Sequence, residues 1–363
     1  MGILLRELRH NKLYWFLVFV PAVLVAEQVA PESHTLLFVL SVVAVVPLAG
    51  LMSRATESVA VKTGDLIGGL LNATLGNLTE LVITIAALRQ GMLDLVKAAL
   101  AGAIVTNTLF MLGASFLLGG LRHRAQEFNP QTARVQSGML LLATIALLIP
   151  SAMSRVEGAA VPRFLQQLSL GLSVVLMANY GLSLLFSLKT HREVFASAGG
   201  GGHGEEEEAW PFSLALVLLI VITVVVALVA EIFVESVQEA ALHLGMTPQF
   251  VGFVVVSLVG GAAEMAAAFS GARKNRLDIS VGIAMGSSTQ IALFVAPLLV
   301  FLSYVLAPTP MDLVFPGGAV LMVLLSTLTV SLVTSSGRAA WYSGVQLLAV
   351  YLVFAVTLYL LPQ

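Results

Sequence analysis

The stretch GNLTELVITIAAL at residues 76–88 places one carboxylate, Glu80, inside a segment that is otherwise apolar enough for lipid. A charged side chain at bilayer depth costs about 2.5–3.5 kcal/mol on insertion scales, so such a residue usually faces a cavity or a partner. The chain repeats the arrangement as GGAAEMAAAF at residues 260–269, with Glu264 lying 184 positions after Glu80. Two carboxylates in matching apolar surroundings predict a paired site inside a membrane protein.

The composition is that of a polytopic membrane protein. Of the 363 residues, 58% are hydrophobic and 10% are charged, whereas a soluble domain carries about 25% charged residues. The net charge of −2 argues against nucleic acid as a partner. The chain has no Cys, and its six His show no HExxH-like spacing, so neither a thiolate site nor a His-bound transition metal is expected. We expect no cofactor.

Apolar segments of about 20 residues can cross a hydrocarbon core of about 30 Å. Eleven such segments are present, with Pro, Gly and charged residues such as Arg54 at the joints. They are residues 12–30, 34–53, 62–89, 94–120, 134–153, 163–188, 210–240, 247–272, 277–305, 312–334 and 340–361. The first resembles a signal peptide but lacks an A-x-A cleavage signal, so we expect a retained helix. The chain is predicted to be an all-α polytopic membrane protein with about 11 transmembrane helices.

The basic residues predict the orientation of these helices. With the N-terminus in the cytoplasm, 14 of the 18 Lys and Arg lie on the cytoplasmic side, and only Arg89, Lys97, Arg155 and Arg163 lie outside. An odd number of spans then puts the C-terminus outside. We expect a multi-pass protein of a prokaryotic cell membrane, in contact with the lipid bilayer. Assembly as a homo-oligomer is left open.

One linker divides the chain. A glycine-rich run at residues 198–204 is followed by the acidic block Glu205–Glu208, which indicates a solvated hinge between two halves. The acidic block either keeps the loop in water or attracts or senses cations, and both readings stay open. The predicted domains are an N-terminal helix at 1–33, a five-helix half at 34–190, the linker at 191–209 and a second five-helix half at 210–363.

The two halves contain an internal repeat. Sliding residues 63–110 onto 247–294 without a gap gives ten identities in 48 positions, among them the two glutamates and Gly76 with Gly260. The glutamates lie on the third and eighth spans, which cross the membrane in opposite directions. This pattern predicts one extra N-terminal helix plus two inverted-topology five-helix repeats, a layout that puts the binding site near the midplane. Asp94 and Asp278 also match, and since both open helices we expect them to cap rather than bind ions.

The chemistry of the pair suits a divalent cation. Two glutamates offer up to four oxygens, and Ca²⁺ takes six to eight. Backbone carbonyls freed beside the glycines can supply more, because glycine tolerates a broken helix. The same carboxylates bind protons, and competition for one site is the physical basis of exchange. The predicted metal ligands and their neighbours are Glu80, Glu264, Asn77, Gly76, Gly260 and Gly261.

Further polar residues are candidates for the transport and proton pathway. The helix after each glutamate carries hydroxyls and amides that either support the site or form ordinary interhelical hydrogen bonds. These are Thr106, Asn107, Ser287, Ser288 and Gln290. Acidic residues at helical spacing either line vestibules or simply face water. These are Glu57, Glu231, Glu235 and Glu239.

At these residues the chain resembles the calcium/cation antiporter superfamily, and within it the CAX-type Ca²⁺/H⁺ antiporter family. GNLTEL at 76–81 resembles the family's first-repeat Gly-Asn-Ala-Thr-Glu motif, and GSSTQIAL at 286–293 resembles its second-repeat helix. The resemblance covers nearly the whole chain. It implies exchange of Ca²⁺, with other divalent cations left open, for H⁺ by alternating access at Glu80 and Glu264. The family's second repeat usually reads Gly-Asn-Ala-Ala-Glu-His, whereas this chain has Gly261 and Met265, so no role of that Asn or His carries over.

Three alternatives were weighed against a Ca²⁺/H⁺ antiporter. A Na⁺-coupled Ca²⁺ exchanger of the same superfamily is expected to have an acidic residue where this chain has Gln290, so Gln290 favours protons. A passive cation channel normally builds its filter from a ring of symmetric subunits, which a single glutamate pair does not provide. An enzyme is not expected, because no nucleophile–base constellation appears in the sequence.

Overall fold

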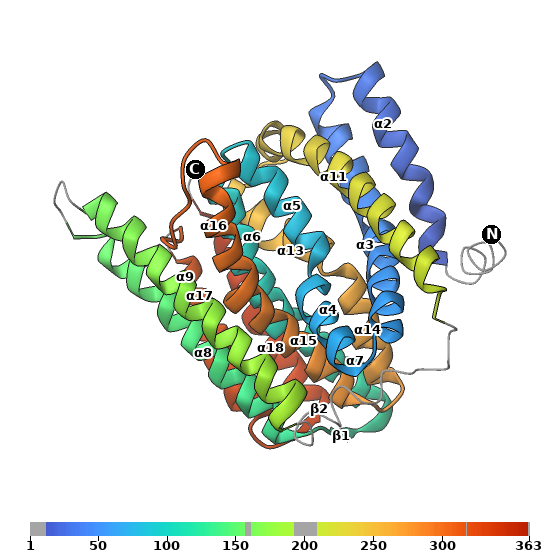
Figure 1. Cartoon of the computed structure of the whole chain (residues 1–363), viewed down its shortest axis with the longest axis vertical. Helices are drawn as coiled ribbons and strands as arrows, with labels where there is room; N and C mark the ends of the chain where they lie inside the picture. The colour runs from blue at the N-terminus through green and yellow to red at the C-terminus, as the bar shows by residue number, and fades with distance from the viewer. Residues whose placement is uncertain (1–11, 157–160, 192–208, 317, 362–363) are drawn as a thin grey trace.

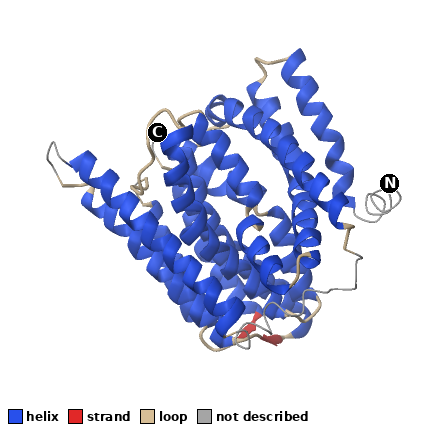
Figure 2. Cartoon of the chain, in the orientation of Figure 1, coloured by secondary structure: helices blue, strands red, loops and turns tan. Residues whose placement is uncertain are grey.

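The protein is almost entirely helical (Figure 2). The computed structural model describes residues 12–156, 161–191, 209–316 and 318–361, so the acidic block Glu205–Glu208 lies outside the described residues. Within this part of the chain, seven helices are long and apolar enough to cross a membrane, and two bent helix pairs and two shorter apolar helices accompany them. Each of the eleven predicted segments overlaps one of these units. A polytopic helical membrane fold is therefore confirmed, while the number of crossings stays a prediction.

The helices before the linker include three runs in which one helix follows the next without a break, η1–α2, α6–η2–α7 and α9–η3. They are η1 (Lys12–Val18), α2 (Phe19–Val29), α3 (His34–Lys62), α4 (Asp65–Leu75), α5 (Leu78–Arg89), α6 (Leu93–Val105), η2 (Thr106–Met111), α7 (Leu112–His123), α8 (Pro130–Met153), α9 (Val161–Leu185) and η3 (Phe186–Thr190). Asn129 caps α8, since its Oδ1 accepts a hydrogen bond from the backbone N–H of Gln131 at 2.9 Å.

The helices after the linker follow a similar order. They are α11 (Phe212–His243), α12 (Pro248–Phe250), η4 (Val251–Val256), α13 (Ser257–Gly260), α14 (Ala262–Arg273), α15 (Leu277–Gln290), η5 (Ile291–Val295), α16 (Ala296–Leu306), α17 (Ala319–Thr334) and α18 (Trp341–Tyr359). Two three-residue strands, β1 (Ala125–Glu127) and β2 (Arg338–Ala340), complete the described structure.

The helices form two outer groups around a central one (Figure 1). On one side, α2 and α11 pack against α3. On the other, α9 packs against α8 and α16, and α17 packs against α8. The bent pairs α4–α5 and α13–α14 lie between these groups together with α6 and α15. The segments that carry the two glutamates thus lie between the two outer groups.

The two central segments match each other in detail at the 184-residue offset. Both glutamate helices, α5 and α14, have the same twelve positions. Two residues after each helix ends, the chain has a residue with positive φ, Gly91 at 74° and Asn275 at 59°. After these turns, the backbone N–H of Met92 bonds to the carbonyl of Ala87, and that of Arg276 bonds to the carbonyl of Gly271. These local matches support the predicted repeat, whose two-fold superposition stays a prediction.

Both glutamate helices follow a break. The chain bends by 43° between Ile67–Leu75 and Leu78–Arg89, and by 60° between Pro248–Gly260 and Ala262–Arg273. The breaks fall at Gly76-Asn77 and at Gly261, where the sequence predicted freed backbone. The π-helical segments η2 and η5 follow at equivalent places in the next helices. Such irregular helices are frequent at functional sites.

The structure corrects three details of the sequence-based interpretation. The purely helical prediction omitted β1 and β2, which pair antiparallel at one end of the bundle (Figure 2). Helix α3 does not end near Arg54 but continues to Lys62, because helical hydrogen bonds do not require apolar side chains. Helix α17 begins at Ala319 rather than near residue 312, after Gly318 with φ of 86°.

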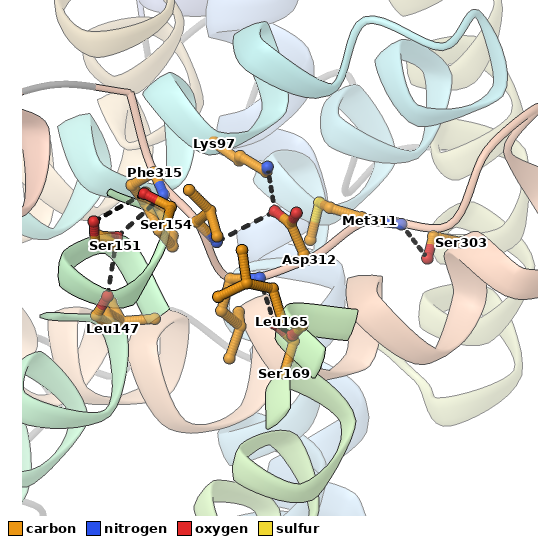
Figure 3. Close-up of polar contacts among 12 residues, drawn as sticks. Lys97, Leu147, Ser151, Ser154, Leu165, Ser169, Ser303, Met311, Asp312 and Phe315 are labelled. Carbon is orange, nitrogen blue, oxygen red and sulfur yellow. Dashed lines mark hydrogen bonds and ion pairs between the residues drawn. The ribbon is translucent and has the colours of Figure 1, made fainter. Parts of the chain in front are cut away.

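The segment before α17 is a loop fixed by serine hydroxyls and one ion pair (Figure 3). The backbone N–H groups of Met311, Leu313 and Phe315 donate to serine hydroxyls of α16, α9 and α8, at 2.8, 2.9 and 3.1 Å. Between them, Asp312 accepts a hydrogen bond from the ammonium of Lys97 on α6 at 2.5 Å. Because Lys97 is 7% exposed, this pair ties the loop to the helix that follows the Glu80 segment.

Candidate functional site

The two glutamates line one small cavity. Each lies in the first turn of its helix, Glu80 on α5 and Glu264 on α14, where the helix dipole favours a negative charge. The cavity also takes its lining from α3, at Ala49, Met52 and Ser53. Its volume of about 10 Å³ leaves room for roughly one water-sized sphere. No Lys or Arg is among its lining residues, so neither carboxylate has a cationic neighbour there.

The glycines of the two breaks make this arrangement possible. A Cβ on Gly260 would lie 2.9 Å from Cγ of Glu80, closer than side-chain contacts allow. A Cβ on Gly76 would lie 3.3 Å from Oε1 of Gln290, and one on Gly261 would lie 3.5 Å from Oδ1 of Asn107. Each break therefore faces a polar side chain from the opposite half of the chain.

A chain of hydrogen bonds joins both halves beside the cavity. Ser287 Oγ donates to Asn77 Oδ1 at 2.7 Å, and Asn107 Nδ2 donates to Ser287 Oγ at 2.9 Å. Four nearby atoms are buried without a hydrogen-bond partner: Asn77 Nδ2, Asn107 Oδ1, Glu264 Oε2 and Gln290 Nε2. Buried polar atoms are nearly always paired, so such a group calls for an explanation. Two of the four are oxygens, the atom type that Ca²⁺ requires.

Two predicted pathway residues lie outside this cluster. Thr106 Oγ1 lies 2.9 Å from Ser257 Oγ and donates to the hydroxyl of Tyr351 at 3.3 Å. Ser288 Oγ donates to the carbonyl of Ala284 at 2.7 Å, a bond within its own helix. Thr106 therefore supports the packing between helices, and Ser288 makes a bond within its own helix.

The predicted vestibule glutamates are distributed over both ends of the bundle. Glu57 is exposed on α3 and accepts a hydrogen bond at 3.3 Å from Ser53, which lines the cavity. Glu231 pairs with Arg89 at 2.8 Å, and both side chains are partly exposed. Glu235 and Glu239 are exposed on the same helix. Of the four, only Glu57 contacts a cavity residue by a hydrogen bond.

The prediction that the two helix-opening aspartates cap their helices is wrong, because each helix begins at the preceding leucine and its N-cap residue, Met92 or Arg276, makes no side-chain cap hydrogen bond. Asp278 Oδ1 accepts a hydrogen bond at 2.6 Å from the backbone N–H of Asn129, the residue that caps α8. Asp94 lies in the first turn of α6. Neither lines the cavity. In the described part of the chain, no three His, Cys, Asp or Glu side chains are grouped to hold a metal.

The sequence-based reading missed two aromatic contacts that cross between the halves. Phe110 on η2 packs against Tyr351 on α18, with ring centroids 5.3 Å apart. Its counterpart at the 184-residue offset, Phe294 on η5, stacks on Tyr180 of α9 at 5.4 Å. The hydroxyl of Tyr180 also donates to the carbonyl of Ala73, just before the first break. The repeat marks both phenylalanines in the sequence, but no pattern marks the tyrosines.

Comparison with known proteins places the chain in a family. The sequence pattern described as sodium/calcium exchanger protein matches residues 33–189 and again 214–360. The chain belongs to the sodium/calcium exchanger protein family. The two matched stretches lie on either side of the glycine-rich linker.

Two proteins of similar sequence match this chain over nearly its whole length. The chain is 36% identical over 368 residues to the "Ca(2+)/H(+) antiporter" of Aphanothece halophytica, with 98% of each chain covered. It is 39% identical over 327 residues to "Ca(2+)/H(+) antiporter ChaA" of Bacillus subtilis, covering 90% of this chain and 92% of the relative. The solved structure of native YfkE matches with a TM-score of 0.80 at 36% identity, covering 95% of this chain and all of YfkE.

Proposed function

We propose that the protein exchanges Ca²⁺ for H⁺ across a membrane, with Glu80 and Glu264 as the shared ligands. The observation that carries this proposal is the cavity lined by two carboxylates from opposite halves, with no cationic side chain beside them. The full-length relatives named as Ca²⁺/H⁺ antiporters support the choice of ions. Asn107 Oδ1 and Glu264 Oε2, which lack partners, supply further oxygens for a bound Ca²⁺.

The proposed mechanism is alternating access, in which the two halves exchange conformations around the cavity. The structure is asymmetric in a way that supports it. Gly102 on α6 lies so close to η4 that a Cβ would overlap the backbone of Phe253. Its counterpart Gly286 on α15 has only Gln136 Nε2 within 4 Å of the same Cβ position, at 3.5 Å. The contact between α6 and η4 is thus closed, whereas the equivalent contact at α15 is open.

The open half has the small residues that the same closure requires. Gly252 of η4 lies against Ala98 and Leu95 of α6, and the equivalent position in the first half is Gly68 on α4. Gly68 now lies against the backbone of Ala60 on α3. In the exchanged state, α4 would leave this contact and dock on α15 through Gly68 and Gly286, while η4 separates from α6. Ca²⁺ would then reach the glutamates from the opposite face, and protons would return through the same carboxylates.

A Na⁺-coupled exchanger is the second candidate, and one residue argues against it. Gln290 lies beside Gly76, close to the cavity, where it offers a neutral amide. A Na⁺ site there would benefit from an anionic oxygen that an amide does not supply.

The test is Ca²⁺ movement in vesicles that contain the purified protein. An imposed pH gradient without Na⁺ is expected to drive Ca²⁺ uphill, and the Glu80→Gln/Glu264→Gln variant is expected not to. Uphill transport that needs a Na⁺ gradient would replace this proposal with the second candidate. Flow that is only downhill, whatever the gradient, would indicate a channel.

A further inference from the structure

A second hollow lies away from the glutamate cavity, at the end of the bundle that carries β1 and β2. It occupies about 890 Å³ between the C-terminal ends of α7 and α14. Three basic side chains line it, Arg122 from α7 and Arg273 with Lys274 from the end of α14. No acidic residue lines it, and none of the three has an ion-pair partner among the described residues.

The negative C-terminal ends of the helix dipoles offset only part of this positive charge. Each helix C-terminus is equivalent to about −0.5 elementary charge, so the ends of α7 and α14 together balance about one of the three cations. An excess of about two positive charges remains, which suits a phosphate group. Arg is also the side chain best shaped to bind phosphate oxygens in a bidentate manner.

The backbone that carries these side chains is fixed by hydrogen bonds between α7, β1 and α14. His123 Nε2 lies 3.0 Å from the carbonyl of Arg273. Gln126 Nε2 donates to the carbonyl of Ala272 and to Asn275 Oδ1, both at 2.9 Å. Gly119 permits this approach, since a Cβ there would overlap the side chain of Gln126. The backbone positions that carry the basic groups are therefore held together before any ligand arrives, which lowers the entropic cost of binding.

The hollow also has an apolar wall. Phe269 and Ala266 of α14 line it, one to two turns before the basic end of the helix. The seven helical steps from Ala266 to Arg273 span about 10 Å. Since the polar interface of a bilayer is about 5–7 Å thick on each side, basic groups at headgroup level would put this wall at the start of the hydrocarbon.

We propose that this hollow binds the phosphate group of an anionic phospholipid, with Arg122, Arg273 and Lys274 on the headgroup and Phe269 against the acyl chain. Free inorganic phosphate shares the anionic chemistry but makes no use of the apolar wall. The site joins the end of α14, whose first turn carries Glu264, to α7. The bound lipid would therefore stabilise the contact between these two helices.

The experiment measures lipid retained by the full-length protein in neutral detergent, by native mass spectrometry with phosphatidylglycerol or phosphatidylcholine. The test variant is Arg122→Gln/Arg273→Gln/Lys274→Gln. The matched control, Lys62→Gln/Arg134→Gln/Lys189→Gln, removes equal charge from the same predicted side of the membrane outside the hollow. Each Lys or Arg that lies against an anionic headgroup contributes about fivefold to its binding, so the test variant is expected to lose roughly 100-fold in phosphatidylglycerol affinity. The control is expected to bind phosphatidylglycerol as wild type does.

Equal retention by the test and control variants would overturn the proposal. Two further measurements keep the result interpretable. The single change Lys274→Gln, at an exposed position beyond the helix, is expected to weaken binding about fivefold if the triple variant does not fold. Millimolar inorganic phosphate is expected to leave the unfolding temperature unchanged. A phosphate-induced rise that equals the effect of phosphatidylglycerol and disappears in the test variant would overturn the assignment to lipid.

Discussion

Replacing Gly286 by Ala is expected to slow turnover while the protein stays folded. In the conformation described here, the added methyl group meets only Gln136 Nε2 at 3.5 Å, an ordinary van der Waals distance. In the exchanged state, α15 would lie against α4 as α6 now lies against η4, and a Cβ at the position of Gly102 overlaps the backbone of Phe253. Overpacking of this kind costs about 1–3 kcal/mol, which shifts the ratio of the two states by roughly 5- to 150-fold.

The gain in helix propensity from Gly to Ala applies to both states and therefore does not change this ratio. The assay compares the initial rate of pH-driven Ca²⁺ uptake in vesicles with the unfolding temperature of the same preparation. Gly138→Ala on α8 is the matched control, because a Cβ there has no atom within 4 Å. An uptake rate for Gly286→Ala equal to that of the control would refute the docking of α4 on α15.

Three other outcomes are expected. Glu80→Gln and Glu264→Gln should each abolish Ca²⁺ uptake without unfolding the protein, since the amide keeps the shape but loses the charge; near wild-type uptake in either would remove that residue from the site. Apparent Ca²⁺ affinity should weaken as pH falls, because protons and Ca²⁺ compete for the same oxygens, and should change little with Na⁺; Gln290→Asp should impair proton-driven uptake. Asp312→Ala should lower the free energy of unfolding by about 1–3 kcal/mol, because it leaves the buried ammonium of Lys97 unpaired. A wild-type thermal denaturation curve for that variant would show that the pair does not hold the loop.

The sequence located the centre of the candidate site because its signals are local. A glutamate in an apolar segment stands out against the cost of burying charge, and the breaks at Gly76 and Gly261 follow from glycine's weak helix propensity. The ungapped repeat then related both segments without any knowledge of tertiary contacts. Asn107, Ser287 and Gln290 came from the same alignment, and the structure brings all three to the glutamates' neighbourhood.

The cavity wall on α3 and the tyrosine contacts depend on packing between distant segments. Met52 and Ser53 lie in a helix that looks like any other apolar span, and only its position against α14 makes them lining residues. The strands β1 and β2 are too short to show an alternating pattern. The end of α3 was predicted wrongly for a different reason. Hydropathy indicates where the apolar segment ends, whereas the helix continues beyond Arg54 through a more polar segment to Lys62.

The crossed aromatic contacts impose an order on biosynthesis. Tyr180 is already made when Phe294 is synthesised, so that contact can form at once. Phe110 must wait for Tyr351, about 240 residues later in the chain. At about 5–20 residues per second, this delay amounts to roughly 10–50 s. During that interval Thr106 and Phe110 lack the cover of α18, so the packing at the centre of the first half is completed only after the last helix of the described chain has been made.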